Sequence, residues 1–300
     1  MNRIIIIDKP IGISSQGVVS RVKKILNIKK AGHTGTLDPM ATGVLPILIG
    51  DATKLSKYLI EHDKTYVATV TLGESRTTGD VEGEVVERDD FNIKNVSEDE
   101  IKEVLNSFLG ETEQIPSIYS AIKINGKKLY EYAREGEEIN IPTRKIFIKS
   151  IKLLGIDLDK NSFEYEVEVS KGTYIRTLSE DIAKKLGTVG YMSSLRRTRV
   201  DKFDLKKAVT LELLEANRGK EFFENVHFLK AEDVFSSLDK IILNKRKEEL
   251  FLNGVKLTFE YPDGLYNIYS FDNKYIGIGI VESNLLKRDV VLKENIEEQE

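Results

Sequence analysis

A single carboxylate, Asp38, lies in a glycine-rich segment, residues 32–47, between apolar stretches of the chain. The three glycines of this segment permit positive φ angles and close approach of the backbone to a ligand, and Pro39 fixes the backbone directly after the carboxylate. A carboxylate held in one direction can serve as a nucleophile or a base. His33 is a second candidate base because histidine titrates near neutral pH. The same composition is also typical of an ordinary turn, so both interpretations stay open on this segment alone.

Strands and one helix around this segment are expected to hold it in place. Residues 4–7 form an apolar run typical of a buried strand, and Ser14 or Ser15 can cap the helix that follows. Residues 44–49 are strand-like, and the alternation over residues 64–73 is the period of a half-buried strand. The segment with Asp38 therefore connects a helix to a strand.

The next part of the chain mixes helices and strands. A capping box at residues 97–100 predicts the start of an amphipathic helix, with Gly110 as its expected end. Residues 119–134 predict a strand, a tight turn and a second element rich in basic and tyrosine side chains. The sequence then predicts an antiparallel pair at 146–158 and 163–170 and a helix at 175–186.

The C-terminal part has a different pattern. Periodicity weakens over residues 217–239, which predicts a linker. Strands are expected at residues 240–243, 255–259, 266–271 and 275–281, with one helix near 246–253. We place a catalytic domain at residues 1–235, a small β-rich domain at 236–294 and an acidic tail at 295–300.

The amino-acid composition excludes several kinds of functional site. The chain of 300 residues has no cysteine and three histidines, which excludes disulfides, thiolate zinc sites and thiol nucleophiles and leaves little for a metal site. Its first apolar run is too short for a signal peptide or a membrane span, so we expect a cytoplasmic protein without metal or cofactor. The net charge is −4, but acidic and basic residues are segregated, and a basic face for nucleic acid is compatible with this sequence.

The whole segment 32–47 closely resembles the catalytic motif of the TruB family, bacterial enzymes that convert a T-loop uridine of tRNA (position 55) to pseudouridine. Further blocks resemble family segments in the family's order: Lys9–Ser15, Lys64–Tyr66, Tyr119–Lys123, Gly172–Leu178 and Leu195–Arg199. The resemblance implies an α+β catalytic domain with a central antiparallel sheet and a cleft across it. The C-terminal region resembles, more weakly, the PUA-type RNA-binding appendage. The implied partner is the T arm of tRNA, with no cofactor and no obligatory protein partner.

The resemblance also implies roles for individual residues. Asp38 matches the catalytic aspartate and Arg176 the arginine beside it, whose charge would offset desolvation of the carboxylate. Tyr66 matches the tyrosine that stacks on the target base. Whether Asp38 attacks the ribose or abstracts a proton stays open.

The remaining matched residues would bind substrate. Tyr174, Ile175 and Leu195 match the region that lines the base pocket, and His33 would occupy the space left by the extruded bases. Lys123 and Arg197 are candidate phosphate contacts. Lys9 and Pro10 match a segment that would support the catalytic loop.

The chain departs from the family pattern at two places. Residues 76–78 read Arg-Thr-Thr where the family commonly has Thr-Asp-Thr, and Ser117 stands where a second proline commonly follows Pro116. Both departures bear on loop geometry and RNA contacts rather than on the reaction.

Three other functions compete with this interpretation. A non-catalytic RNA-binding or RNA-folding protein could use the same groove. A nucleoside or glycoside hydrolase would need a second placed carboxylate or a metal to activate water, and the matched blocks contain no second carboxylate. Guide-RNA-dependent relatives share the motif but act in multiprotein particles. We expect the C-terminal domain to be an accessory RNA-binding module that is not needed for reaction on an isolated T-arm hairpin, and the alternative is a structural brace.

Overall fold

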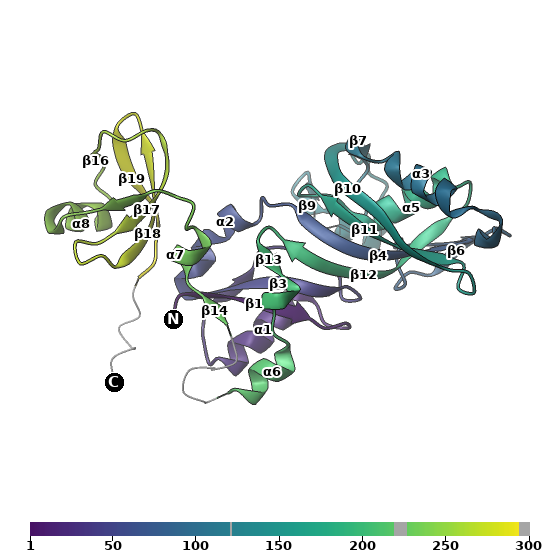
Figure 1. Cartoon of the computed structure of the whole chain (residues 1–300), viewed down its shortest axis with the longest axis horizontal. Helices are drawn as coiled ribbons and strands as arrows, with labels where there is room; N and C mark the ends of the chain where they lie inside the picture. The colour runs from purple at the N-terminus through teal and green to yellow at the C-terminus, as the bar shows by residue number, and fades with distance from the viewer. Residues whose placement is uncertain (121, 219–226, 294–300) are drawn as a thin grey trace.

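The computed structural model describes residues 1–120, 122–218 and 227–293. In these ranges a ten-stranded sheet forms the larger part of the molecule and a five-stranded sheet lies at one end of its long axis (Figure 1). The predicted acidic tail at 295–300 lies outside the described residues, and so does part of the predicted linker.

The large sheet has the strand order β14-β1-β3-β12-β4-β11-β10-β7, with β13 beside β12 and β2 beside β3. The strands are β1 (Arg3–Lys9), β2 (Ala31–His33), β3 (Thr42–Ile49), β4 (Lys64–Leu72), β7 (Gly110–Gln114), β10 (Arg144–Asp157), β11 (Ser162–Val169), β12 (Gly190–Val200), β13 (Phe203–Asp204) and β14 (Phe228–Leu229). All pairs are antiparallel except β12 and β3, which run parallel where Arg196 lies opposite Thr42. The predicted central antiparallel sheet is confirmed, with this one parallel junction.

Two pairs of helices pack on the large sheet. The helices of the large domain are α1 (Ser15–Ile25), α2 (Ser56–Leu59), α3 (Glu98–Asn106), α4 (Leu129–Glu135), α5 (Ile175–Lys185), α6 (Leu211–Ala216) and α7 (Ala231–Val234). Its 3-10 turns are η1 (Gly50–Leu55), η2 (Ile93–Asn95) and η3 (Leu205–Lys207). Helices α3 and α5 bury apolar residues against β4, β10, β11 and β12 in one core cluster. Helices α1 and α6 pack with β1 and β3 in another.

Two helices begin at the capping residues that the sequence predicts. The Ser14 hydroxyl accepts a hydrogen bond from the Gly17 amide at 3.0 Å, and Ser97 accepts one from the Glu100 amide at 3.2 Å, so both predicted caps are confirmed. The predicted end at Gly110 is wrong. Helix α3 ends at Asn106, and Gly110 instead begins β7, which pairs with β10.

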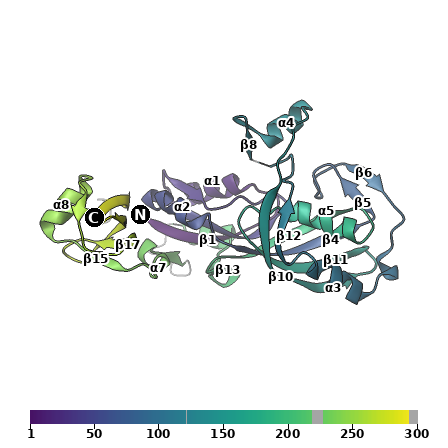
Figure 2. The ribbon, with the colours of Figure 1, turned by 90° about the horizontal axis from the view of Figure 1, so that it is seen from above.

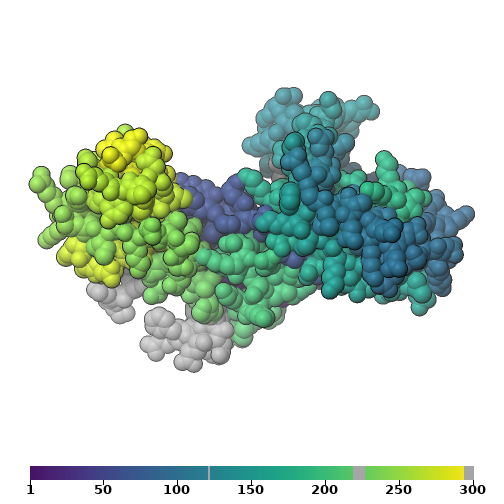
Figure 3. Space-filling view, turned by 45° about the horizontal axis from the view of Figure 1, so that its top comes forward, coloured from purple at the N-terminus to yellow at the C-terminus, as the bar shows by residue number. Residues whose placement is uncertain are grey.

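Two small hairpins extend from the large sheet. Strands β5 (Glu74–Arg76) and β6 (Val85–Arg88) form one, and β8 (Lys123–Ile124) with β9 (Lys127–Lys128) forms the other. The second turns at Asn125 and Gly126, both with positive φ, as the sequence predicts. It stands out from the body of the molecule together with α4 (Figures 2 and 3).

The small sheet has the order β15-β17-β18-β19-β16. Its elements are β15 (Lys240–Ile242), β16 (Leu257–Thr258), β17 (Gly264–Tyr269), β18 (Tyr275–Glu282), β19 (Leu285–Val291) and helix α8 (Lys245–Leu252). The β-rich character is as predicted, whereas β19 was not foreseen. The domain boundary at 235/236 stays a prediction.

The small sheet packs against the large domain. Ile278 and Val290 share an apolar cluster with Ile4 and Leu55. The Asp289 carboxylate accepts from Lys57 Nζ at 2.5 Å and also from the Tyr58 hydroxyl. This interface ties the C-terminal sheet to η1 and α2.

Candidate active site

One cavity of about 430 Å³ gathers most of the predicted site. Its lining residues are Thr36, Leu37, Asp38, Tyr66, Tyr119, Ser120, Tyr130, Thr173, Tyr174, Ile175, Arg176 and Leu195. Six of the nine predicted site residues are therefore brought together from the catalytic loop, β4, α5 and β12. The other three, His33, Lys123 and Arg197, lie outside this lining.

Buried polar side chains hold the loop that carries Asp38. The Ser15 hydroxyl accepts from the Leu37 amide at 2.8 Å and lies 3.1 Å from the Leu37 carbonyl, to which it donates. Lys9 is fully buried, and its Nζ donates to the carbonyls of Pro39 at 3.1 Å and Ala41 at 2.5 Å. These contacts fit the supporting role expected for Lys9.

Arg197 supports the same loop from the sheet side. It is 1% exposed, its Nε donates to the Val44 carbonyl at 2.7 Å, and its Nη2 donates to the Gly35 carbonyl at 3.1 Å. Gly43 has a φ of +103°, and a Cβ there would lie 2.1 Å from the Arg197 carbonyl oxygen, so only glycine permits this approach. Arg197 thus supports the loop with two of its donors, and its role as a phosphate contact stays a prediction.

Arg176 lies between two carboxylates. Its Nε is 3.3 Å from Asp38 Oδ2, and its Nη1 is 3.5 Å from Oδ2 of Asp80. Sequence reasoning missed Asp80, because it opens an acidic stretch and nothing local marks it. Asp80 is 2% exposed and accepts from the Thr78 hydroxyl at 2.6 Å and the Glu82 amide at 3.0 Å.

The charge of Asp38 is set by opposing effects. Burial raises the pKa of the Asp38 carboxyl above its usual value, and Asp80 adds to this, while Arg176 and Lys9 lower it. The two cations therefore favour the ionised form that a nucleophile or base requires. The Asp38 side chain is 34% exposed, so its carboxylate is open to the cavity.

Apolar and aromatic walls surround this carboxylate. Tyr66 on β4, Leu195 on β12 and Ile175 at the start of α5 are all nearly buried. Tyr119 and Tyr130, from either side of the β8-β9 hairpin, add two aromatic rings that sequence reasoning did not assign. The cavity suits a flat, uncharged ring.

Two predicted binding residues lie elsewhere. Lys123 is exposed on β8, on the projecting hairpin. His33 ends β2, and its Nδ1 accepts from the Gly35 amide at 3.3 Å. Burial and, to a lesser degree, Arg197 lower the pKa of His33, which favours the neutral imidazole.

The departure at residue 76 has a structural explanation. Arg76 Nη1 donates to the carbonyls of Val81 at 3.1 Å and Gly83 at 3.3 Å, so its guanidinium closes the turn that carries Asp80. Glu74 holds the guanidinium at 2.8 Å from the other side. The centroid of the Tyr191 ring lies 4.5 Å from the Arg76 guanidinium carbon, a cation–π contact.

Within the described ranges, no cluster of three or more histidine, cysteine, aspartate or glutamate side chains could hold a metal ion. The helices of those ranges also include none that is long and apolar enough to cross a membrane.

The overall structure is similar to chains in two solved complexes. A Cbf5-Nop10-Gar1 complex matches with a TM-score of 0.69 and 28% identity, over 98% of this chain and 84% of that chain. A structure of an H/ACA RNP bound to a substrate RNA containing 2'-deoxyuridine matches with a TM-score of 0.69 and 25% identity, over 97% of this chain and 85% of that chain. The chain therefore shares its fold with the matched chains of these complexes, and the matching family profile places it in the class of pseudouridylate synthases.

Sequence comparison gives the family. The profile described as TruB family pseudouridylate synthase (N terminal domain) matches residues 23–175, and that of the tRNA pseudouridylate synthase B C-terminal domain matches residues 176–244. The tRNA pseudouridine synthase B of Clostridioides difficile is 43% identical over 93% of this chain and 94% of its own length. That of Bacillus cytotoxicus is 41% identical over 98% of this chain and 96% of its own length. The chain belongs to the TruB family, as its motifs predict.

Proposed function

We infer that this chain is a tRNA pseudouridine synthase that isomerises the T-loop uridine. In the reaction the N1–C1′ bond breaks, the base turns, and a C5–C1′ bond forms while a proton leaves C5 and N1 gains one. No atom is gained or lost overall. The observation that carries the proposal is the ionisable Asp38 at the mouth of an aromatic cavity, beside Arg176.

The site residues would act as follows. Asp38 attacks the ribose or abstracts a proton, and Arg176 keeps it ionised and directed. Tyr66, Ile175 and Leu195 hold the flipped uracil between flat and apolar surfaces. The T arm of tRNA is the partner proposed for this site, without an obligatory protein partner, in the cytoplasm.

A hydrolase is the less favoured alternative. Asp80 supplies the second carboxylate that such an enzyme would need, but it is 2% exposed and engaged by Thr78, Glu82 and Arg176. A carboxylate bound in this way has no place for a water to be activated.

The direct test incubates the pure protein with an unmodified T-arm hairpin and maps pseudouridine. We expect conversion at the T-loop uridine alone, and none in a hairpin with cytidine there. Release of free uracil would instead identify a hydrolase, and binding without either product would identify an RNA-binding protein.

The domain interface leads to a prediction about truncation. Removal of residues from 238 onward exposes the apolar cluster shared by Ile4, Leu55, Ile278 and Val290, so we expect a fall in melting temperature of about 10 °C. Single-turnover rates should fall on the T-arm hairpin and on whole tRNA together. Loss on whole tRNA alone, with an unchanged melting temperature, would instead support an accessory RNA-binding module.

The turn closed by Arg76 leads to another prediction. Arg76→Ala should lower the single-turnover rate about tenfold by loosening Asp80, and should add little in an Asp80→Asn background. The matched control is Arg88→Ala, because Arg88 pairs with the same Glu74 at 2.9 Å without reaching the turn. Additive losses from Arg76→Ala and Asp80→Asn would show that Arg76 acts by another route.

A further inference from the structure

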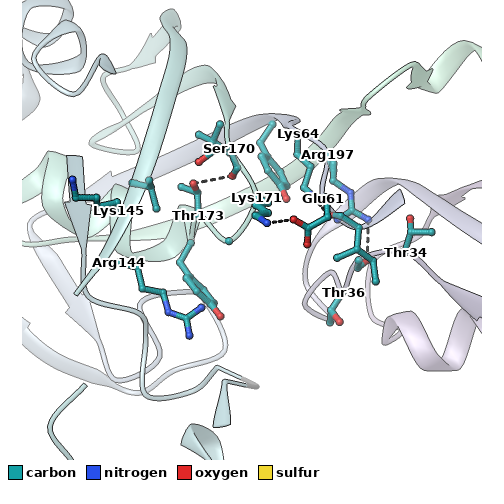
Figure 4. Close-up of a pocket in the computed structure, with 17 residues that line it drawn as sticks. Thr34, Thr36, Glu61, Lys64, Arg144, Lys145, Ser170, Lys171, Thr173 and Arg197 are labelled. Carbon is teal, nitrogen blue, oxygen red and sulfur yellow. Dashed lines mark hydrogen bonds and ion pairs between the residues drawn. The ribbon is translucent and has the colours of Figure 1, made fainter. Parts of the chain in front are cut away.

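A second cavity, of about 620 Å³, adjoins the catalytic cavity. The two share Thr36, Tyr66, Thr173 and Tyr174. The walls of this groove come from the catalytic loop, from Ile60 and Glu61 before β4, from the start of β4, from the start of β10 and from the segment after β11 (Figure 4). A strand whose base enters the catalytic cavity therefore has the groove directly beside it.

The groove is strongly basic. Its charged lining consists of Lys64, Arg144, Lys145, Lys171 and Arg197 against the one carboxylate of Glu61. Such a lining, next to a nucleotide site, matches the backbone phosphates of a nucleic acid.

Not all of these cations are available to a ligand. Arg197 is buried and bonded to carbonyls, and Lys64 Nζ donates to the Ile60 carbonyl at 3.2 Å. The Arg144 side chain is exposed and forms no hydrogen bond or ion pair with any described residue. Lys145 is exposed and pairs only with the exposed Glu111, at 2.8 Å. Arg144, Lys145 and Lys171 are thus the cations able to meet an incoming phosphate.

Lys171 already has a partner. Its ammonium forms an ion pair with Glu61 across the groove, from the segment after β11 to the segment before β4 (Figure 4). Both side chains are 57% exposed. An ion pair so exposed contributes little to stability, so replacing the carboxylate by a phosphate costs the protein little.

We propose that this groove binds a backbone phosphate of the RNA next to the target nucleotide, and that Lys171 exchanges Glu61 for that phosphate on binding. Glu61 is then a built-in competitor that weakens RNA binding. Arg144, on the opposite wall, contacts the same stretch of backbone. This inference rests on the proposed function, because it takes the strand in the groove to be the substrate RNA.

The test measures the dissociation constant of the unmodified T-arm hairpin in an Asp38→Asn background, which prevents turnover. We expect Glu61→Gln to tighten binding about threefold. Lys171→Gln should weaken binding about tenfold and lower the slope of log K against log salt by about 1. Glu61→Gln should have no effect once Lys171 is replaced, because Glu61 acts through Lys171.

Glu98→Gln is the matched control. It removes an exposed carboxylate that pairs with Lys102 on α3 at 2.7 Å, outside the groove lining. Equal tightening by Glu61→Gln and Glu98→Gln would reduce the effect to net charge and overturn the proposal. Weaker binding with Glu61→Gln, at an unchanged melting temperature, would also overturn it, since the pair would then brace the groove for RNA.

The chain with Asp38 intact is assayed in parallel for pseudouridine. No product from that chain would overturn the proposed function itself. If product forms but the Glu61 and Lys171 variants bind RNA as the parent does, the phosphate-binding role of the groove is overturned and the proposed function stands. A second variant at each position, Glu61→Ala and Lys171→Met, repeats the binding measurement. Thermal melting of each variant checks that it is folded.

Discussion

Asp38→Asn is expected to abolish isomerisation while leaving RNA affinity within about twofold. An amide is neither a nucleophile nor a base at neutral pH, so the single-turnover rate should fall by at least about 10³, or ~4 kcal/mol of barrier. The substitution is nearly isosteric, and the loop is held by Lys9 and Ser15 rather than by the carboxylate. Rapid-quench assays on the T-arm hairpin, with filter binding, measure both quantities.

Asp8→Asn is the control for this substitution. Asp8 lies on the neighbouring strand β1 and pairs with Arg196 at 2.7 Å, outside the catalytic cavity. Asp8→Asn removes the same charge as Asp38→Asn, and we expect its single-turnover rate to stay within about threefold of the parent. An Asp38→Asn rate within about tenfold of the parent would remove Asp38 from the chemistry.

Local periodicity was enough to predict five of the ten strands of the large sheet, but not the central strand β12. The alternation over residues 64–73 corresponds to β4, whose Tyr66, Ala68 and Val70 face the core. The 146–170 pair corresponds to β10 and β11, with Asn161 in the left-handed region between them. The alternation of apolar and polar residues and the turn residues that define these strands are local in the sequence, so the strands can be predicted from it.

Contacts between distant segments were not predictable in this way. Strand β14 adds to the edge of the sheet through Ile4 and Ile5, although its own two residues carry no strand pattern. Gly110 has a positive φ that is typical of a helix end, but it serves the start of β7. In both cases pairing with a remote strand decides the structure.

The site shows the same division. The motif resemblance identified Asp38, Arg176 and Tyr66, and the structure places all three around one cavity. Asp80 and the Glu61–Lys171 pair are defined only by contacts across the fold. Arg197 lies in a basic segment that suggests phosphate binding, yet the strand direction of β12 turns its side chain into the protein.

Arg176→Lys is expected to lower the single-turnover rate about a hundredfold, or ~2.7 kcal/mol of barrier. The guanidinium reaches Asp38 through Nε and Asp80 through Nη1, whereas a lysine ammonium is a single point charge on a flexible stem. Arg199→Lys is the matched control, because Arg199 forms an ion pair with Glu168 at 2.7 Å away from the cavity lining. An Arg176→Lys variant that turns over as fast as the parent would show that charge alone suffices.

Removing the charge altogether adds a pH test to the same residue. Arg176 lowers the pKa of Asp38, so Arg176→Met should raise that pKa further above its usual value. A carboxylate with a higher pKa becomes ionised only at higher pH, and the acid limb of the rate profile must therefore move to higher pH. Arg176→Lys, which keeps a cation, should move the acid limb less than Arg176→Met does. A lower rate with an unmoved acid limb in both variants would assign Arg176 to orienting the substrate instead of holding Asp38 ionised.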